Sequence, residues 1–522
     1  MKRVLVTEKL APAGLERLAE AGLEVDVRLD LTPEELIEAV PGAAAVIVRS
    51  ATRVTRPVLE AGRDLVVVGR AGIGLDNVDV EAATELGVMV VNAPQSNAVS
   101  AAEHAIALML SLARNIPQAD SSLRAGRWER SRWTGVELSE KTVGVIGLGR
   151  IGRLVAERLA GFGVELLAYD PYVTAEGAGQ LNVELVTLEE LMRRSDFVTI
   201  HLPRTPETAG LIDARALARA RPGLRIVNAA RGGIIDETAL DVALAEGRIA
   251  GAALDVFTEE PPTGSPLLTR DDVVVTPHLG AATVEAQTRA GVTIAEQVVL
   301  ALSGQFVPLA VNIRAAQVSD ELQPYLPLAE KLGLFAAERC PERPVTVVIG
   351  AVGNLADYDT RILELAVLKG MLGPFHDAPV TYVNAPQVAQ AMGISARVER
   401  HSESVSYRNL LEVEACGHRV AGTMIEPLSE PRVVAIDGHQ VDVPVASHLV
   451  LIRNRDRPGM MGAVGLALGR AGINISHMSL GRAPGDELAL MVLVTDEPVP
   501  PEVVDALVAV DGITSVERVD LD

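Results

Sequence analysis

Short apolar runs alternate with longer helical stretches over the first two-thirds of the chain. The runs consist mainly of Val, Ile, Leu and Ala, and polar or glycine-containing segments separate them. Strands that alternate with helices build parallel sheets with helices on both faces, so their side chains are apolar on both sides. The pattern predicts strands at residues 3–7, 44–49, 65–70, 88–92, 142–146, 165–169, 197–201, 225–228, 250–256 and 273–276.

Helices are predicted between these strands, among them residues 13–21, 101–113 and 151–162. The helix at 101–113 is apolar almost all round, which indicates a buried position. A long Ala- and Val-rich stretch at 283–302 follows the last of these strands. We expect it to carry the chain back onto the first domain.

The texture of the chain changes after about residue 315. Prolines gather in a linker-like stretch, and apolar runs at 345–349, 404–416 and 433–435 predict strands of a separate α/β domain. The last unit follows the βαββαβ order of a ferredoxin-like domain. Its predicted elements are residues 448–452, 460–471, 473–480, 487–494, 501–510 and 513–518.

Composition limits the possible partners. At roughly 150 residues per domain, 522 residues suggest about three or four domains. A net charge of −22 disfavours general binding to nucleic acid or to an anionic membrane, so neither is expected as a partner. The chain begins without a signal peptide and has no run of about 18 apolar residues. We therefore expect a cytoplasmic protein.

Two cysteines, Cys340 and Cys416, lie far apart in the sequence, and no Cys or His cluster has metal-ligand spacing. We expect no metal site, and we interpret both cysteines as structural thiols in a reducing compartment.

A glycine-rich turn is the most specific motif. Gly147, Gly149 and Gly152 follow the strand at 142–146 and open a helix. The first glycine permits a tight turn, the second lets the backbone approach a pyrophosphate, and the third allows close packing of helix on strand. Asp170 ends the next strand, where a carboxylate accepts hydrogen bonds from the ribose 2′-OH of NAD and repels the 2′-phosphate of NADP. The motif predicts an NAD site.

Polar residues follow three further strands. Arg231 follows the strand at 225–228, the adjacent Glu259 and Glu260 follow that at 250–256, and His278 follows that at 273–276. Ligands of open α/β sheets bind at the carboxyl ends of strands, so these side chains are expected in one cleft.

Hydride transfer from a 2-hydroxy acid needs a guanidinium for the carboxylate, an imidazole for the hydroxyl proton and a carboxylate to orient the imidazole. The residues alone do not choose between Glu259 and Glu260.

The segments GLGRIG, NAARGGIIDE, ALDVFTEEPP and TPHLGAAT resemble, in this order, the D-2-hydroxyacid dehydrogenase family over roughly the first 315 residues. The resemblance implies that Arg231, Glu260 and His278 are catalytic. It also implies a Rossmann-type doubly wound NAD domain at residues 98–281, inserted into a flavodoxin-like substrate domain at 1–97 and 282–315. The implied NAD contacts are Gly147, Gly149, Arg150, Ile151, Gly152, Asp170, Ala229, Ala230, Arg231, Asp255, His278, Leu279, Gly280 and Ala281.

A second glycine-rich stretch, GRAGIG after the strand at 65–70, has the wrong spacing for a nucleotide, and we interpret it as a substrate-facing loop. This loop, VRSAT and GRWERSRWTGVEL resemble the branch of the family that oxidises 3-phospho-D-glycerate in the first step of L-serine biosynthesis. In that branch the Trp-rich segment lies near a dimer contact, where an arginine would serve the neighbouring subunit. The implied substrate ligands are Arg49, Ser50, Arg70, Gly72, Arg130 and Arg132.

The C-terminal third resembles the regulatory part of the long form of this branch. Residues 447–522 resemble an ACT domain, which implies L-serine as effector at Asn454, Asp456 and Asn474, in a homodimer or homotetramer. Residues 317–446 resemble the α/β intervening domain, for which the resemblance implies an anion or substrate site. Its basic residues are interpreted as ordinary surface residues: Arg400, His401, His418 and Arg419.

Three other hypotheses remain at this point: a hydroxypyruvate or glyoxylate reductase of the same family, an NAD-sensing corepressor on the same scaffold, and a C-terminal tail that only assembles the oligomer. The two added C-terminal domains and the phosphoglycerate-type segments favour the phosphoglycerate enzyme.

Overall fold

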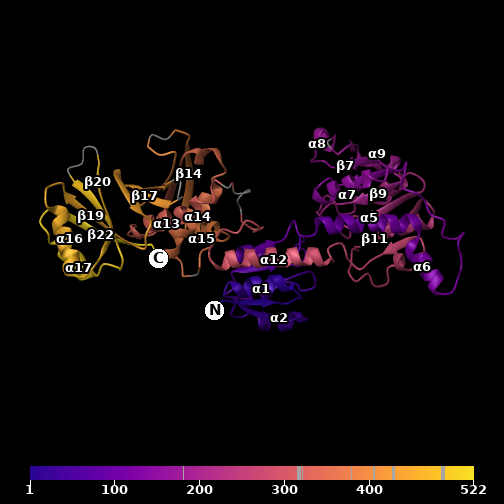
Figure 1. The fold of residues 1–522 in the computed structure, drawn as a ribbon, viewed down its shortest axis with the longest axis horizontal. Helices are drawn as coiled ribbons and strands as arrows, with labels where there is room; N and C mark the ends of the chain where they lie inside the picture. Colours follow the sequence, from indigo (N-terminus) through magenta and orange to yellow (C-terminus); the bar gives the residue numbers. More distant parts are fainter. Residues whose placement is uncertain are drawn as a thin grey trace.

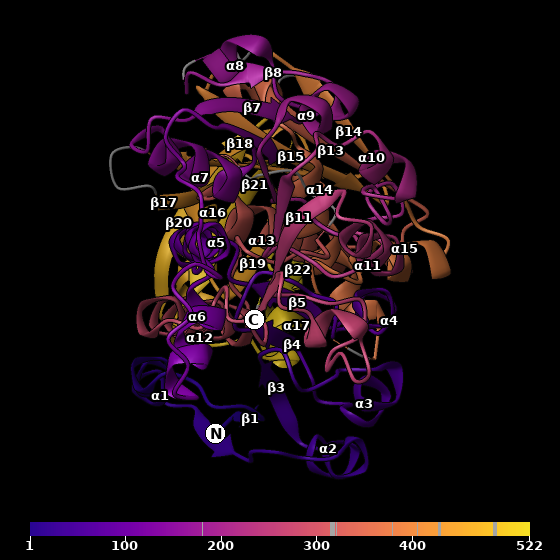
Figure 2. The ribbon, with the colours of Figure 1, turned by 90° about the vertical axis from the view of Figure 1, so that its right-hand side faces the viewer.

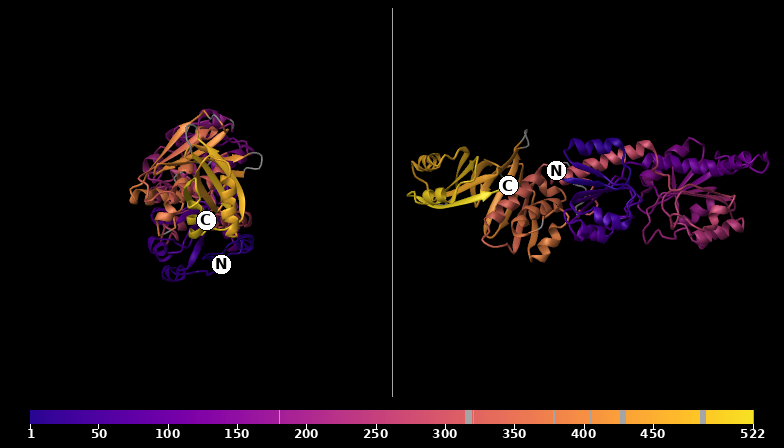
Figure 3. Two further views of the ribbon diagram at one scale, coloured as in Figure 1. Left: turned by 90° about the vertical axis from the view of Figure 1, so that its left-hand side faces the viewer. Right: turned by 90° about the horizontal axis from the view of Figure 1, so that it is seen from below.

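The structure, a computed structural model, describes residues 1–179, 181–313, 319, 321–377, 379–403, 406–425, 430–483 and 488–521. These residues form four β-sheets, each with its own helices. Figure 1 shows the four units along an elongated molecule, with the second unit in sequence at one end and the fourth at the other. The view from below gives the same order (Figure 3). We number these four domains by the order of their sheets.

The first domain has a parallel sheet in the order β2-β1-β3-β4-β5, the flavodoxin-like order. Its strands are β1 Arg3–Val6, β2 Glu24–Val27, β3 Ala43–Val48, β4 Val67–Arg70 and β5 Met89–Asn92. Its helices are α1 Pro12–Glu20, α2 Pro33–Ala39, α3 Arg56–Ala61, α4 Val80–Glu85 and α12 Val284–Leu302. Helix α12 packs on α1 and β4, so the long stretch does return to the first domain.

The second domain has a parallel sheet in the order β12-β11-β10-β9-β6-β7-β8. Winding reverses between β6 and β9, as in Rossmann folds, and ligands bind at such a reversal. The strands are β6 Thr142–Ile146, β7 Glu165–Tyr169, β8 Glu184–Leu185, β9 Phe197–Ile200, β10 Leu224–Asn228, β11 Ile249–Leu254 and β12 Val273–Val275. The helices are α5 Ala98–Arg114, α6 Ile116–Arg124, α7 Arg150–Ala160, α8 Ala175–Gly179, α9 Leu188–Arg194, α10 Ala214–Ala218, α11 Glu237–Ala245 and the 3-10 turn η1 Pro266–Thr269.

Seen end-on, the second domain lies in front of the others and the first domain extends below it (Figure 2). As predicted from its apolar surface, α5 is largely buried, and it packs on α7, β10 and β11.

The third domain has a mixed sheet in the order β14-β13-β15-β16-β17-β18, in which β13 is parallel to β14 and antiparallel to β15. Its strands are β13 Thr346–Gly353, β14 Ser395–His401, β15 Asn409–Ala415, β16 His418–Ile425, β17 Glu430–Ile436 and β18 His439–Pro444. Its helices are α13 Tyr325–Glu338, α14 Arg361–Leu372, α15 Ala385–Ala391 and the 3-10 turns η2 Asn354–Asp357 and η3 Gly373–Phe375.

The fourth domain has the predicted βαββαβ order and an antiparallel sheet in the order β20-β21-β19-β22. Its elements are β19 His448–Arg455, α16 Met460–Arg470, β20 Ile475–Arg482, β21 Leu488–Thr495, α17 Pro501–Val508 and β22 Ile513–Asp520. Helices α16 and α17 cover one face of the sheet. The other face, through Leu449 and Leu490, joins the core of the third domain in one continuous cluster.

Ion pairs cross the same junction between the third and fourth domains. The Arg339 guanidinium is almost fully buried and lies 2.9 Å from both Asp437 in the third domain and Glu517 in the fourth. Arg453 of the fourth domain lies 2.6 Å from the same Asp437 carboxylate. Burial disfavours the charged form of Asp437, but hydrogen bonds from the Arg339 guanidinium and the Arg419 backbone N–H hold its pKa below the usual value.

The expectation of two separate thiols is wrong. Cys340 and Cys416 form a disulfide, with their Cα atoms 5.6 Å apart. The end of α13 meets the turn between β15 and β16, which lies 76 residues later in the sequence. Only the fold of the third domain brings the two residues together, so their spacing gave no signal.

Some expectations concern residues that the structure does not describe. They are the domain boundary at 315–317 and the first residues of the strands predicted at 404–416 and 487–494. Within the described ranges, no helix is long and apolar enough to cross a membrane.

Candidate active site

The glycine turn after β6 has the geometry that its sequence predicts. Gly147 has φ +94°, and a side chain there would meet the His201 carbonyl. A Cβ on Gly152 would collide with the Gly147 carbonyl, so only glycine lets α7 lie this close to β6. A Cβ on Gly149 would meet nothing within 4 Å. The turn is therefore closely packed at Gly147 and Gly152 and open at Gly149. Gly149 directly precedes the free N–H groups of α7, where a phosphate is expected to bind.

Asp170 lies beside this turn, at the end of β7. Its carboxylate accepts hydrogen bonds from the backbone N–H of Leu148, at 2.8 Å, and of Tyr172, at 2.9 Å. The acid predicted to bind the ribose is thus fixed next to the predicted phosphate site. Together, the open glycine and the adjacent carboxylate fit a dinucleotide without a 2′-phosphate.

His278 and Glu260 form a direct pair. The Nδ1 atom of His278 lies 2.8 Å from Oε2 of Glu260, whose other oxygen accepts a hydrogen bond from the Phe257 N–H at 3.1 Å. The two side chains are 45% and 39% exposed, so a substrate can reach the imidazole. This contact distinguishes Glu260 from Glu259, a choice that the residues alone left open.

Asp255 fixes the turn that carries His278. Its side chain is fully buried, and its oxygens accept hydrogen bonds from Thr276 Oγ1 at 2.6 Å, Leu279 N at 2.7 Å and Gly280 N at 2.9 Å. Burial opposes ionisation, but hydrogen bonds from His104, Thr276 and Leu279 outweigh it and lower the pKa of Asp255. The residue predicted as a cofactor contact therefore also anchors the turn, a task that its sequence context did not reveal.

Arg231 and Arg70 face each other across the two domains. Arg231 Nη1 donates a hydrogen bond to the Ala230 carbonyl at 2.8 Å, and its Nε lies 3.5 Å from Asp76 of the first domain. The Arg70 guanidinium folds over Gly72, where any side chain would overlap it. Burial lowers the pKa of Arg70 to about 10, and the positive charge of Arg231 adds to that effect. Two arginines held close together, with Asp76 as a nearby counter-charge, make a site that suits an anionic ligand.

Arg49 and Ser50 belong to the loop after β3, and Glu8 holds this loop. The Glu8 carboxylate accepts hydrogen bonds from the backbone N–H groups of Arg49 at 2.8 Å and Thr52 at 2.9 Å. Burial alone would raise the pKa of Glu8, but the backbone hydrogen bonds outweigh it, so the pKa of Glu8 is below its usual value. Sequence reasoning missed Glu8, although it stands just after β1 and shares the strand-end position of the other site residues.

Arg130 and Arg132 do not join this cluster within one chain. Both are exposed in the segment after α6, where Arg132 lies 2.9 Å from Asp271 and stacks on the Trp133 ring. Figure 1 shows α6 on the side of the second domain turned away from α1. Any contact of these two arginines with substrate would have to involve another subunit.

Two of the predicted effector residues, Asp456 and Asn474, lie on loops of the fourth domain, and Asn454 lies in strand β19. Asp456 forms an ion pair with Arg482 at 2.7 Å. The Asn474 amide donates a hydrogen bond to Asp496 at 2.6 Å. Asn454 is buried in the sheet, which leaves Asp456 and Asn474 as the more accessible polar groups.

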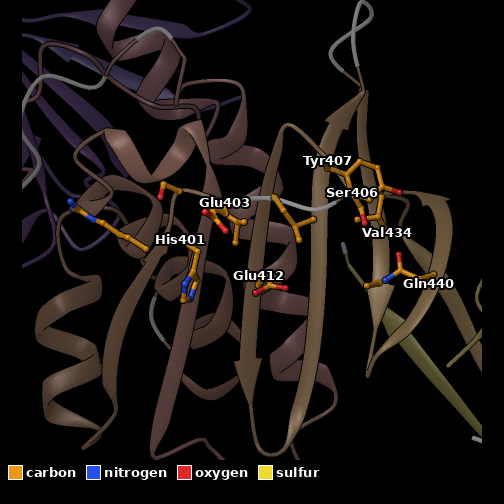
Figure 4. A pocket seen from close by; sticks show the side chains of 12 residues that line it. His401, Glu403, Ser406, Tyr407, Glu412, Val434 and Gln440 are labelled. Atoms are coloured by element: carbon orange, nitrogen blue, oxygen red, sulfur yellow. The ribbon is translucent and has the colours of Figure 1, made fainter. Parts of the chain in front are cut away.

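The third domain carries a cavity of about 700 Å³. Figure 4 shows His401, Glu403, Tyr407 and Glu412 among the side chains around it. Arg400 and His401 therefore line a cavity, where the sequence suggested an ordinary surface. His418, by contrast, lies 3.5 Å from Asp437, and Arg419 pairs with Glu412 at 2.5 Å. The lining carries both signs of charge.

Family models match three parts of the chain. Residues 106–280 match the NAD binding domain of D-isomer specific 2-hydroxyacid dehydrogenases. Residues 321–437 match the D-3-phosphoglycerate dehydrogenase intervening domain, and residues 448–512 match the ACT domain.

Full-length relatives cover all four domains. D-3-phosphoglycerate dehydrogenase of Mycobacterium tuberculosis is 47% identical over 525 residues, with 99% of both chains covered. The enzyme of the same name from Archaeoglobus fulgidus is 42% identical over 529 residues, with 99% of this chain and 100% of its own covered.

Solved structures match the first two domains. Apo D-lactate dehydrogenase of Escherichia coli has a TM-score of 0.54 at 33% identity and covers 60% of this chain and 100% of its own. NAD-dependent formate dehydrogenase of Staphylococcus aureus, in complex with NAD, has a TM-score of 0.51 at 35% identity and covers 57% and 94%. The predicted fold class, the ACT-type tail and NAD as cofactor are thereby confirmed.

Proposed function

The chain belongs to the D-3-phosphoglycerate dehydrogenases, and we propose that Arg231, Glu260 and His278 carry out its reaction, the NAD-dependent oxidation of 3-phospho-D-glycerate to 3-phosphooxypyruvate that begins L-serine biosynthesis. The observation that carries this assignment is the His278–Glu260 pair, which lies next to the turn fixed by Asp255. The coverage of the relatives over all four domains supports this reaction over a hydroxypyruvate or glyoxylate reductase and over a corepressor.

His278 acts as the base in this proposal. Because its Nδ1 faces Glu260, its Nε2 is left for the C2 hydroxyl of the substrate. Neutral His278 takes the hydroxyl proton during oxidation, and Glu260 stabilises the resulting imidazolium. Arg231 binds the substrate carboxylate through its planar guanidinium and orients C2. Bound NAD supplies the hydride acceptor. The glycine turn, the N-terminus of α7 and Asp170 hold it.

Selectivity for a phosphorylated substrate rests on the arginines of the first domain. The charges of Arg49 and Arg231 both act on the buried Arg70. A substrate with a carboxylate and a phosphate offers enough negative charge to neutralise such a group, whereas an unphosphorylated hydroxy acid does not. Ser50 and Gly72 border these arginines and complete the proposed substrate site. Arg130 and Arg132 could serve only a neighbouring subunit's site.

The remaining assignments extend this proposal. The substrate domain spans residues 1–97 and 282–315, the NAD domain 98–281, the intervening domain 317–446 and the ACT domain 447–522. L-serine is the proposed effector at Asn454, Asp456 and Asn474, in a cytoplasmic homodimer or homotetramer. The match of residues 448–512 to the ACT domain and the accessible polar groups of Asp456 and Asn474 support an amino-acid ligand.

Steady-state kinetics test the proposed function. NADH formation is followed by absorbance from NAD and either 3-phospho-D-glycerate or unphosphorylated D-glycerate, with a reagent that traps the ketone. We expect 3-phospho-D-glycerate to be preferred by about 100-fold or more in kcat/KM, because the phosphate forms charge-assisted hydrogen bonds that D-glycerate lacks. Equal rates with D-glycerate would contradict the substrate assignment. Suppression by L-serine would support the effector site, and indifference to serine would reduce the ACT domain to assembly.

A further inference from the structure

A histidine and an aspartate form a pair behind the catalytic turn. His104 lies on α5, with its side chain 19% exposed, and its Nε2 is 3.0 Å from the fully buried Oδ1 of Asp255. The same nitrogen lies 3.2 Å from Thr276 Oγ1. This imidazole contacts the residues that anchor the turn, Asp255 and Thr276, and not the pair of His278 with Glu260. Neither the residue pattern nor the reaction scheme gives it a role.

The hydrogen bonds around this pair define its donors and acceptors. The Thr276 hydroxyl and the N–H groups of Leu279 and Gly280 all donate to Asp255. A carboxylate only accepts, so the His104 nitrogen that faces it must carry a proton. His104 therefore supplies the one side-chain N–H donor among the contacts of Asp255. The carboxylate that it holds receives the two N–H groups that directly follow His278.

His278 depends on this anchor for its orientation. Its backbone has φ +56°, a left-handed conformation that is uncommon outside glycine and is maintained only when the surroundings fix it. The hydrogen bonds from Leu279 and Gly280 to Asp255 provide that constraint. A loosened Asp255 would let the turn relax and would move the imidazole away from Glu260.

Helix α5 also reaches the connections between the first two domains. It begins at Ala98, directly after the first crossing, and Ser100 Oγ lies 2.8 Å from Oγ1 of Thr283, the N-cap of α12 at the second crossing. His104 follows Ser100 by about one turn of the same helix. One rigid element therefore touches both crossings and the anchor of the catalytic turn.

We propose that His104 is a positioning residue of the dehydrogenase: its Nε2–H holds the Asp255 carboxylate and thereby keeps His278 aligned with Glu260 and the substrate hydroxyl. This inference rests on the proposed function, because it assigns His278 the proton transfer. His104 touches neither the Arg70–Arg231 cluster nor the glycine turn by any contact described above. Its loss should therefore affect the chemical step more than substrate binding.

Three substitutions of His104 separate a hydrogen bond from simple packing. His104→Gln places an amide N–H near the position of Nε2, His104→Asn places it near Nδ1, and His104→Phe keeps the ring volume without a donor. Proton transfer is sensitive to misplacement of about an ångström, so we expect His104→Phe and His104→Asn to lower kcat about tenfold or more. The KM for 3-phospho-D-glycerate should stay within about threefold, and His104→Gln should restore kcat to within about threefold of the wild-type value.

The control is Met109→Ala, a buried position on the same helix that is not among the hydrogen-bond partners of Asp255 given above. It should lower the melting temperature but leave kcat within about twofold well below that temperature. The proposal is overturned if His104→Phe and His104→Asn match the wild-type kcat, or if His104→Gln is as impaired as His104→Phe. If His104→Phe does not fold, the comparison of His104→Asn with His104→Gln decides.

If the wild-type enzyme did not turn over 3-phospho-D-glycerate, the proposed function would be wrong, and that result would not test the role of His104. The position of His278 can then be followed without a substrate by its imidazole ¹⁵N–¹H signals, identified by their loss in His278→Asn. We expect these signals to shift in His104→Phe and to remain near their wild-type positions in His104→Gln. Unchanged His278 signals in His104→Phe would overturn the positioning role.

Discussion

The joint between the first and second domains differs in construction from the joint between the third and fourth. Among the described residues, no buried cluster is shared by the first two domains: each has its own cores. The third and fourth domains share one core, which includes Leu328 from one and Leu449 and Leu490 from the other. Buried ion pairs of Arg339 close the second joint. The first joint therefore has no shared apolar core among the described residues, whereas the second joint is a continuous apolar core.

The difference follows from what each joint must do. A cleft that admits substrate and excludes water has to open and close, so its two sides cannot share a core. The third domain is also tied to the first: Val383 lies in the first domain's core, and Thr381 Oγ1 donates to the Gly87 carbonyl at 3.3 Å. The first, third and fourth domains are therefore joined by packing contacts, and we expect the second domain to move against them when the substrate site closes.

The largest expected effect is at the cleft. Replacing His278 with Asn removes the proposed base, and we expect kcat to fall by about 10²- to 10⁴-fold, the range for a lost general base. The KM for substrate should change little, because the Arg70–Arg231 cluster remains. The melting temperature should not change, since the imidazole is nearly half exposed. A kcat within tenfold of wild type would remove His278 from the mechanism.

A substitution at the joint between the third and fourth domains should lower stability and leave the chemical step unaffected. Arg339→Met leaves the mostly buried Asp437 and the half-buried Glu517 without this partner, which should cost about 3 kcal/mol of stability. Both tryptophans, Trp128 and Trp133, lie in the second domain. Calorimetry should therefore show a lower transition temperature for the C-terminal domains. The unfolding of the second domain, followed by tryptophan fluorescence, should be the same as in the wild type.

The matched control for Arg339 is Arg419→Met, which breaks the more exposed pair with Glu412 in the same domain. That change should cost at most about 1 kcal/mol. Equal losses of stability in the two variants would mean that the buried Arg339 ion pairs stabilise this joint no more than an exposed ion pair does.

Arg70 gives a smaller effect that is confined to binding. Arg70→Met should raise the KM for 3-phospho-D-glycerate by about 10- to 100-fold, the value of one or two charge-assisted hydrogen bonds. The KM for NAD should stay near its wild-type value. Arg132→Met tests whether a neighbouring subunit contributes. An unchanged KM would confine the substrate site to one chain, and a raised KM would show that the cleft is completed by a second chain.

The last effect concerns pH and stays within the second domain. Burial lowers the pKa of the His201 imidazole to about 4, and its Nε2 lies 2.9 Å from Thr199 Oγ1. Between the ordinary value near 6.5 and about 4, the unfolded chain binds more protons than the folded chain. Stability should therefore fall with decreasing pH in this window, by at most about 1.4 kcal/mol per pH unit, and this contribution should stop changing below about pH 4.

His201→Gln should remove this part of the pH dependence. Urea unfolding followed by tryptophan fluorescence between pH 7 and 4 measures it, because both tryptophans report on the second domain. Parallel pH profiles for the wild type and His201→Gln would contradict the assignment.

Sequence reasoning reached the parts of the fold that local pattern encodes. The apolar strands of the first two sheets, the glycine turn and the βαββαβ unit all have short-range signals. Strands such as β14 Ser395–His401 were missed, because their polar, half-exposed residues resemble loops. The disulfide, the Glu8 anchor and the His104–Asp255 pair depend on contacts between distant segments, which spacing does not reveal.

Hydrogen–deuterium exchange of the full chain tests the contrast between the two joints most directly. Exchange is compared without ligand and with NADH plus saturating 3-phospho-D-glycerate, a 2-hydroxy acid that cannot react with the reduced cofactor. We expect slower exchange at the glycine turn, at the turn after His278 and at both crossing segments between the first two domains. No change is expected at the turn that carries Asp437 or at the strands that carry Arg453 and Glu517. Protection of the Arg339 junction as large as that of the cleft, or an unchanged cleft, would contradict it.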